Sequence, residues 1–185
     1  MLDRLLQWDR ETLIYLNNLG DPGFDQFWVL VTSITNWIPL YILFGVLIGI
    51  THHRKEAIYK IITLITLTMV ILILTHLVKE TVMRLRPNNE PTLDGLIRVL
   101  KEPDSYSFFS GHAATSFGMV TLLVLFIRKK LKWVWLFFGW SAIFAYSRIY
   151  IGVHYLLDIL VGMLFGPLVA FLFYRIYHRF ITPGT

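Results

Sequence analysis

The sequence predicts an all-α fold: an integral membrane helical bundle of about five to six transmembrane helices, preceded by an N-terminal amphipathic helix. The 185 residues are 56% hydrophobic and 16% charged, whereas soluble domains are roughly 25% charged. The mean hydropathy is +0.60. Apolar runs of about 20 residues, the length that crosses a bilayer core, recur along most of the chain. The chain therefore has room for one membrane domain over residues 1–185.

Residues 1–20 form the first expected element. Their apolar side chains recur at helical spacing, and charged residues lie between them. This pattern predicts an amphipathic helix, which either lies in the membrane interface or packs on the bundle.

The predicted transmembrane bundle covers residues 24–178. Its first apolar region, 24–50, contains Asn36 and Pro39 and so predicts either one span or a short helix followed by a second. The further spans are expected at 57–78, 112–127, 133–151 and 153–174.

Three basic clusters, at residues 52–55, 128–132 and 175–179, mark one side of the bundle as cytoplasmic if the spans alternate. The long polar loop 84–111 then lies on the opposite, non-cytoplasmic side. That side also carries several cations, which the positive-inside tendency disfavours there. We interpret this excess as a binding site for an anion.

Composition excludes some chemistry. Because the chain has no cysteine, disulfides, thiolate metal sites and cysteine nucleophiles are ruled out. The formal net charge of +5 does not indicate nucleic acid binding, because the basic residues lie at the ends of apolar spans and form no polar face.

Three polar segments fall at the non-cytoplasmic ends of the predicted spans. They are Lys79 to Pro87, Phe109 to His112, and Ser147 to Asp158. In the first, Pro87 favours an extended conformation of Arg86 and helps to end the helix. The seven-residue spacing of Lys79 and Arg86 equals two helical turns, so the two side chains can point the same way. In the second, Ser110 is a good helix N-cap, and the free N–H groups of such a helix start attract anions.

In the third segment, His154 and Asp158 have the i, i+4 spacing of one helical turn. On a helix, the carboxylate accepts a hydrogen bond from one imidazole nitrogen and leaves the other free to attack. Asp158 lies in an apolar stretch, where an unpaired carboxylate is costly.

The three segments, Lys-x6-Arg-Pro, Ser-Gly-His and Ser-Arg-x5-His-x3-Asp, resemble the signature motifs of the type 2 phosphatidic acid phosphatase (PAP2) family, which includes bacterial membrane lipid phosphatases. The motifs cover residues 79–158. Phe109 stands where the family usually has proline, which affects loop geometry or substrate choice rather than a reacting group.

The resemblance implies a phosphatase that needs neither a metal nor a cofactor. His154 would be the nucleophile that forms a phosphohistidine, Asp158 would orient it, and His112 would protonate the leaving oxygen. The phosphoryl group would be bound by the remaining motif residues, Lys79, Arg86, Ser110, Gly111 and Arg148.

The expected substrates are lipid phosphates or lipid pyrophosphates: polyprenyl pyrophosphate, lipid A phosphate, phosphatidic acid or phosphatidylglycerol phosphate. The expected location is the bacterial plasma membrane, with the site facing outward. Two alternatives stay open: a lipid-to-lipid phosphotransferase, and a non-catalytic protein that binds phospholipid headgroups. The sequence does not fix the oligomeric state.

Other residues have weaker interpretations. A metal site of His112, His154 and Asp158 is disfavoured because the nearby cations repel a divalent ion. His76 is expected to be structural. For Arg84, Arg98 and Lys101, contact with a second phosphate and plain solvation explain the sequence equally well.

Overall fold

The computed structural model describes residues 1–181, and these form helices and connecting loops only. The α-helices within that range are α1 (Leu2–Asn18), α2 (Asp25–Val31), α3 (Ile38–Thr51), α4 (Arg54–Val82), α5 (Gly111–Ile127), α6 (Phe137–Tyr150) and α7 (Leu156–Ile176). Short 3-10 turns occupy Pro22–Phe24, Ile34–Trp37, Pro87–Asn89, Pro91–Leu93 and Lys132–Leu136, and a π-helical turn occupies Tyr177–Ile181. The predicted all-α fold is confirmed. The last four residues of the predicted 1–185 domain lie outside the described residues.

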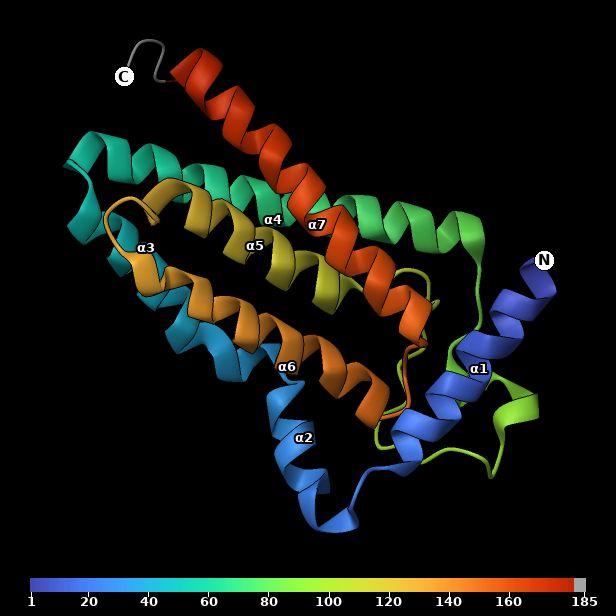
Figure 1. Ribbon diagram of the computed structural model, residues 1–185. Coiled ribbons are helices and arrows are strands. Elements are labelled where there is room, and N and C mark those ends of the chain that lie inside the picture. The colour runs from blue at the N-terminus through green and yellow to red at the C-terminus, as the bar shows by residue number, and fades with distance from the viewer. Residues whose placement is uncertain (182–185) are drawn as a thin grey trace.

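Helices α3 to α7 correspond to the five predicted spans and run back and forth along the bundle (Figure 1). Within the described residues, three stretches are apolar and long enough to cross a membrane: Ile34–Thr51, Arg54–Leu93 and Leu156–Ile181. Helix α5 is apolar but shorter, at 17 residues. The predicted break in the first apolar region is present, because a loop and a 3-10 turn separate α2 from α3.

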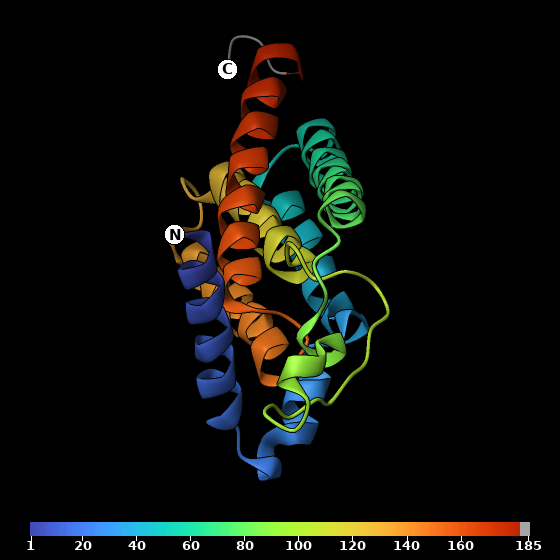
Figure 2. The same cartoon turned by 90° about the vertical axis from the view of Figure 1, so that its right-hand side faces the viewer.

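Helix α5 occupies the centre of the bundle (Figure 2). It packs against α3, α4, α6 and α7, and most of its side chains are buried. A helix that is apolar on all sides is stable in this position because each face meets another helix.

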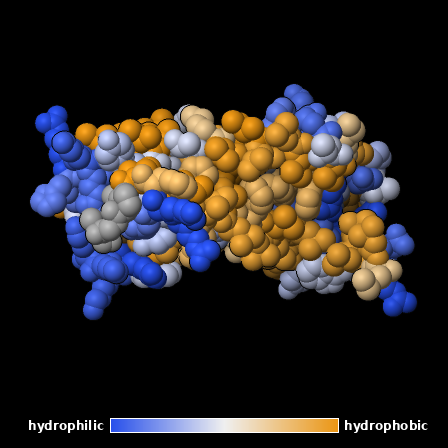
Figure 3. Space-filling view, turned by 90° about the horizontal axis from the view of Figure 1, so that it is seen from above, coloured by the Kyte–Doolittle hydropathy of each residue, from blue (hydrophilic) through white to orange (hydrophobic). Residues whose placement is uncertain are grey.

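The face of the molecule seen in Figure 3 is apolar around the middle of the bundle and more hydrophilic toward its ends. Large apolar side chains are exposed along the helices, for example Ile42, Ile65, Leu164 and Leu168. The links α3–α4 and α5–α6 and the end of α7 lie together at one end (Figure 1). The three basic clusters belong to these segments, so they share one end as the alternation predicts.

Helix α1 crosses the other end of the bundle, against α6 and α7. Its buried face consists of Asp9, Leu13 and Asn17, while Leu2, Leu5 and Trp8 are exposed. The helix therefore packs on the bundle with one face and leaves apolar side chains on another, which suits a helix at a membrane surface.

Glycines allow α5 and α7 to approach closely. A Cβ atom on Gly166 would lie 2.1 Å from the carbonyl oxygen of Ala114, and one on Gly162 would lie 2.6 Å from that of Ser110. Small residues at such a helix pair let the two backbones touch. This contact sets the distance between the first turns of α5 and α7, which carry the site.

Gly166→Ala is expected to destabilise the protein by about 1–3 kcal/mol, because the new methyl group meets backbone that has no room to move. Thermal unfolding in detergent measures the change. Gly45→Ala on α3 is the matched control, since apart from the adjoining backbone of its own helix no atom lies within 4 Å of its added Cβ. That variant is expected to be as stable as the parent or more so, because alanine is the better helix former. Equal unfolding temperatures for both variants would contradict this packing.

Candidate active site

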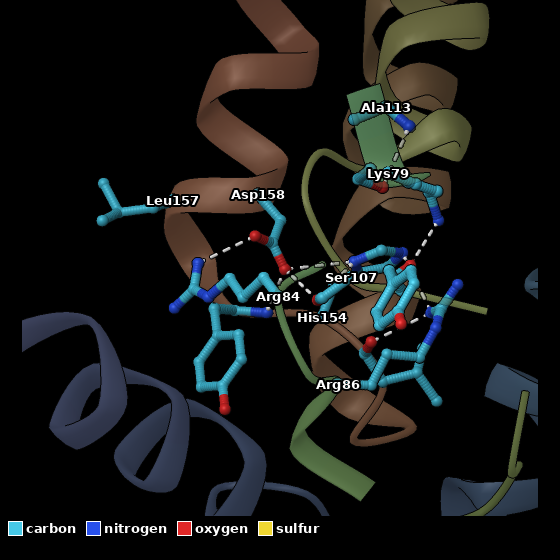
Figure 4. Close-up of polar contacts among 12 residues, drawn as sticks. Lys79, Arg84, Arg86, Ser107, Ala113, His154, Leu157 and Asp158 are labelled. Carbon is cyan, nitrogen blue, oxygen red and sulfur yellow. Dashed lines mark hydrogen bonds and ion pairs between the residues drawn. The ribbon is translucent and has the colours of Figure 1, made fainter. Parts of the chain in front are cut away.

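The candidate site lies at the end of the bundle where α5 and α7 begin (Figure 4). The backbone N–H of Ser110 donates to the carbonyl oxygen of Asp158 at 3.0 Å, which ties the start of α5 to the first turn of α7. The second and third motifs are therefore held together by backbone.

His154 and Asp158 form the predicted pair. The distance from Nδ1 of His154 to Oδ2 of Asp158 is 3.2 Å, and both side chains are buried. The prediction that both residues lie on one helix is wrong, however, because α7 begins only at Leu156. His154 lies in the loop before the helix, and Asp158 turns back to it from the first helical turn.

Asp158 also caps its own helix. Its Oδ2 accepts a hydrogen bond from the backbone N–H of Tyr155 at 3.0 Å and another from the hydroxyl of Ser107. Ser107 Oγ lies 3.3 Å from Nδ1 of His154. The carboxylate, the hydroxyl and the imidazole thus form one buried group, in which Nδ1–H of His154 donates to the acid.

Arg86 lies on the other side of the imidazole. Its Nη1 is 3.2 Å from Nε2 of His154 and donates to the carbonyl oxygen of Val153 at 3.1 Å. Arg86 is extended, with φ −76° and ψ 155°, as the following proline predicts. Its Nη2 also donates to Ser105 Oγ at 2.9 Å.

Lys79 and Arg86 do not share a helix face, although their spacing of two helical turns would allow it. Helix α4 ends at Val82, and Met83 is left-handed with φ 51°. Arg86 therefore reaches the site from the following loop. Lys79, still on α4, donates from Nζ to the carbonyl oxygen of Tyr106 at 2.8 Å. That contact brings it to the segment that carries Ser107.

His154 is held neutral in this environment. Burial, together with the positive charges of Arg86 and Arg148, holds the pKa of its imidazole well below the usual value. Since Nδ1 donates to Asp158, the lone pair of the neutral ring is on Nε2, where Arg86 donates to it. That nitrogen has the form required of a nucleophile.

His112 and Arg148 meet at Thr32. Nε2 of His112 donates to the carbonyl oxygen of Thr32 at 3.2 Å, and Nη1 of Arg148 donates to its hydroxyl at 2.8 Å. The His112 ring stacks on Phe144 with 4.7 Å between centroids. Thr32, which the sequence analysis did not identify, thus connects the second motif to the third.

The second motif begins α5 as predicted. Ser110 is the N-cap, and its hydroxyl accepts from the backbone N–H of Ala113 at 3.4 Å. Gly111 is the first residue of the helix, so its N–H is one of those that a helix start leaves free. Phe109, at the position of the usual proline, is buried against Phe165 with 4.8 Å between ring centroids.

A cavity of about 490 Å³ opens beside these residues. His112 and Arg148 line one part of it, and the other lining residues are Thr32, Ser33, Ile34, Thr35, Lys101, Glu102 and Pro103. The predicted proton donor and one predicted phosphate ligand therefore face a space larger than a phosphate. Lys101 lies on its wall, so its contact with a second phosphate remains a prediction.

Two other cations, Arg84 and Arg98, have ion-pair partners within the protein, so they are not simply solvated charges. Their contact with a second phosphate stays a prediction. Arg84 pairs with Asp158 at 2.8 Å and with Asp9 at 2.7 Å. Arg98 pairs with the carboxylate of Asp25 and donates to the carbonyl oxygen of Gly20 at 2.7 Å. His76 is largely exposed, with its Nδ1 4.0 Å from Glu80.

The charges of the site suit an anion. Arg86 and Arg148 are buried, and Lys79 reaches the same end of the bundle. Residues 1–181 contain no group of three or more His, Cys, Asp or Glu side chains that could hold a metal ion. Several positive groups beside a single orienting carboxylate attract a phosphoryl group.

Solved structures share this fold. A PAP2-type phosphatidylglycerolphosphate phosphatase from Bacillus subtilis superposes with a TM-score of 0.76 at 20% identity, covering 96% of this chain and 88% of that one. LpxE of Aquifex aeolicus superposes with a TM-score of 0.69 at 28% identity, covering 89% of this chain and 93% of that one.

Sequence comparison gives the same result. A lipid A 4′-phosphatase of Bacteroides thetaiotaomicron is 30% identical over 184 residues, which are 97% of this chain and 81% of that protein. An undecaprenyl-diphosphatase of Sulfolobus acidocaldarius is 30% identical over 176 residues, which are 86% of this chain and 82% of that protein. The family model of the PAP2 superfamily matches residues 57–182. As its motifs predict, this chain belongs to the PAP2 superfamily.

Proposed function

We propose that this protein removes phosphate from a lipid phosphate or lipid pyrophosphate through a phosphohistidine formed on Nε2 of His154. One observation carries the proposal: the imidazole is held between Asp158 at Nδ1 and Arg86 at Nε2. The acid fixes the tautomer, and the guanidinium lies where a phosphoryl oxygen must bind for the nitrogen to reach phosphorus.

In the first step, a phosphoryl oxygen accepts the N–H of Arg86, which frees the lone pair of Nε2. The nitrogen attacks phosphorus, and the bond from phosphorus to the lipid oxygen breaks. The imidazole becomes positively charged as the new P–N bond forms, and the carboxylate of Asp158 balances that charge. His112 enters this step as the imidazolium, a form that the negative charge of the bound phosphoryl group favours. Because its Nε2–H is held by Thr32, its Nδ1–H is the group that gives a proton to the leaving oxygen, which leaves the ring neutral.

In the second step, water attacks the phosphorus of the phosphohistidine. Nδ1 of His112 accepts the proton from this water, the P–N bond breaks, and inorganic phosphate leaves. The electron pair returns to Nε2, which restores the neutral imidazole. Arg86, Arg148, Lys79 and the N–H groups at the start of α5 stabilise the negative charge of both transition states.

The lipid character of the substrate follows from the position of the site. The reacting groups lie at one end of a bundle with an apolar surface, so a tail can stay in the bilayer while its phosphate enters the cavity. Two sequence relatives are named for lipid A and for undecaprenyl diphosphate. A lipid A phosphate and a polyprenyl pyrophosphate are therefore the substrates to test first.

The side of the membrane follows from charge. The site and the three basic clusters lie at opposite ends of the bundle. If the basic end is cytoplasmic, the substrate enters from the outer leaflet.

Purified protein is expected to release phosphate from at least one lipid in a panel of lipid A, polyprenyl pyrophosphate, phosphatidic acid and phosphatidylglycerol phosphate. Because the proposed electrophilic groups are side chains and helix N–H groups, activity should survive EDTA. Vanadate should inhibit it, since the ion resembles the five-coordinate transition state. A strict requirement for an added divalent ion would overturn the mechanism. Phosphate recovered mainly on a second lipid would indicate a phosphotransferase.

A further inference from the structure

A buried chain of charges connects the N-terminal helix to the catalytic acid. Asp9 of α1 and Asp158 of α7 are both fully buried, and the guanidinium of Arg84 lies between them. Nη2 of Arg84 is 2.7 Å from Oδ2 of Asp9. Its Nη1 is 2.8 Å from Oδ1 of Asp158, and Figure 4 shows these two side chains facing each other. The three groups are far apart in the sequence and meet only in the fold.

Asp9 uses both oxygens to position its neighbours. Besides binding Arg84, it accepts the backbone N–H of Leu157 on Oδ1 at 2.8 Å. This N–H belongs to the first turn of α7, next to Asp158. One carboxylate of α1 therefore fixes both the guanidinium and the backbone that carries the acid.

Arg84 has little freedom to move. The ring of Tyr155 covers its guanidinium, with Cζ 3.8 Å from the ring centroid. A different carboxylate binds each of its two Nη atoms. A planar guanidinium held in this way presents its N–H group in one direction.

As a result, the two carboxylate oxygens of Asp158 bind different groups. Oδ1 is bound by Arg84, while Oδ2 receives the N–H of Tyr155, the hydroxyl of Ser107 and Nδ1–H of His154. Rotation of the carboxylate would break the bond to Arg84. The guanidinium thereby keeps Oδ2 directed at the imidazole.

Asp9 also reduces the extent to which Arg84 neutralises the negative charge of Asp158. With Asp158 as its only partner, the guanidinium would form a one-to-one ion pair in a buried place, where charges act strongly. With Asp9 on its other side, two carboxylates share one positive charge. Asp158 therefore keeps more negative charge to balance the imidazolium that forms on phosphorylation.

We propose that Asp9 and Arg84 are positioning residues of the phosphohydrolase, and that they act through Asp158 to orient and polarise His154. The inference rests on the proposed function of His154. It makes α1 part of the catalytic apparatus, although none of its residues lines the cavity that His112 and Arg148 face. A helix with exposed apolar side chains such as Leu5 and Trp8 thus holds the nucleophile through two ionic contacts.

The test compares Asp9→Asn with Asp3→Asn, an equal change at an exposed position of the same helix. Asp9→Asn preserves the shape of the side chain, and its amide oxygen can still accept the backbone N–H of Leu157. It removes the negative charge that binds Arg84 together with Asp158. We expect kcat to fall about tenfold with KM unchanged, as is usual when a supporting partner of a reacting group is lost. Asp3→Asn should keep both constants.

A double variant separates positioning from general stability. If Asp9 acts only through Arg84, Asp9→Asn combined with Arg84→Gln should lose no more activity than Arg84→Gln alone. Thermal unfolding of each variant shows that the compared proteins are folded. If Asp9→Asn does not fold, Arg84→Lys takes its place, and the same fall in kcat at constant KM is expected.

The inference is overturned if folded Asp9→Asn has the kcat of the parent, or if the two losses multiply in the double variant. These results are distinct from a failure of the proposed function. If His154→Ala is inactive while Asp9→Asn is fully active, only the positioning role is wrong. If His154→Ala stays active, the function itself is wrong.

Discussion

Replacing His154 with alanine is expected to lower kcat for lipid phosphate hydrolysis by at least about a thousandfold, because the variant lacks the atom that forms the covalent intermediate. Asp158, Arg86 and His112 remain, but none of them is placed to replace Nε2. Phosphate release from the best lipid of the panel measures the effect.

The control is His76→Ala. His76 lies on α4 with an exposed side chain, so its loss should leave kcat unchanged. His154→Gln serves as a second variant, since its amide can still occupy the buried space between Asp158 and Arg86. Both His154 variants should retain vanadate binding, because the cations that hold the anion are unaffected.

Trapping the intermediate makes the result specific. Rapid quenching of the parent enzyme with phosphorus-labelled lipid should yield protein-bound label that is stable in base and lost in acid, as expected for a phosphoramidate. The label should be absent from His154→Ala. A variant that still releases phosphate at the rate of the parent would leave only headgroup binding or another nucleophile as explanations.

The bundle and the reacting residues could be predicted from the sequence because their signals are local. An apolar run of fixed length predicts a span wherever it lies, and the predicted regions 57–78 and 153–174 agree closely with α4 and α7. The pairing of His154 with Asp158 was also predicted. Only the prediction that both residues lie on one helix was wrong. The carboxylate of Asp158, in the first turn of α7, reaches back to His154 in the preceding loop.

The supporting residues could not be predicted because their contacts span the whole chain. Asp9 lies 75 residues from Arg84 and 148 from Leu157. Position along the chain gives no indication of such partners. One signal was present: Asp9, Leu13 and Asn17 share a helical stripe, and polar residues on a stripe that packs on the bundle imply buried partners.

Loop conformation was the other obstacle. Arg86 and Ser107 act from the segment between α4 and α5, which periodicity does not describe. The left-handed Met83 ends α4 and redirects the chain, although methionine is not a residue that usually adopts this conformation. Pro87 predicts the extended Arg86, but no sequence pattern indicates the left-handed turn at Met83.

Replacing Arg148 with methionine is expected to lower kcat/KM about 10²–10³-fold, the usual cost of removing one charged group from a transition state. Arg148 is 7% exposed, and its Nη1 donates to Thr32. Its Nε is buried and has no hydrogen-bond partner among the residues that the structure describes. A phosphoryl oxygen in the adjacent cavity would satisfy this N–H.

The same variant is expected to unfold at an equal or higher temperature. A buried guanidinium with an unsatisfied N–H is costly to keep in a folded protein, and methionine fills similar volume without charge. Arg128→Met is the matched control: Arg128 is exposed at the other end of the bundle, so kcat/KM should not change there.

Activity and stability should therefore change in opposite directions at Arg148, a combination that a structural arginine would not produce. If Arg148→Met lost stability together with activity, the arginine would be a packing residue. If it kept its activity, phosphate binding would depend on Arg86 and Lys79 alone. A stable, inactive variant that no longer binds vanadate would mean that the protein keeps an unpaired buried donor because the phosphoryl group is its partner.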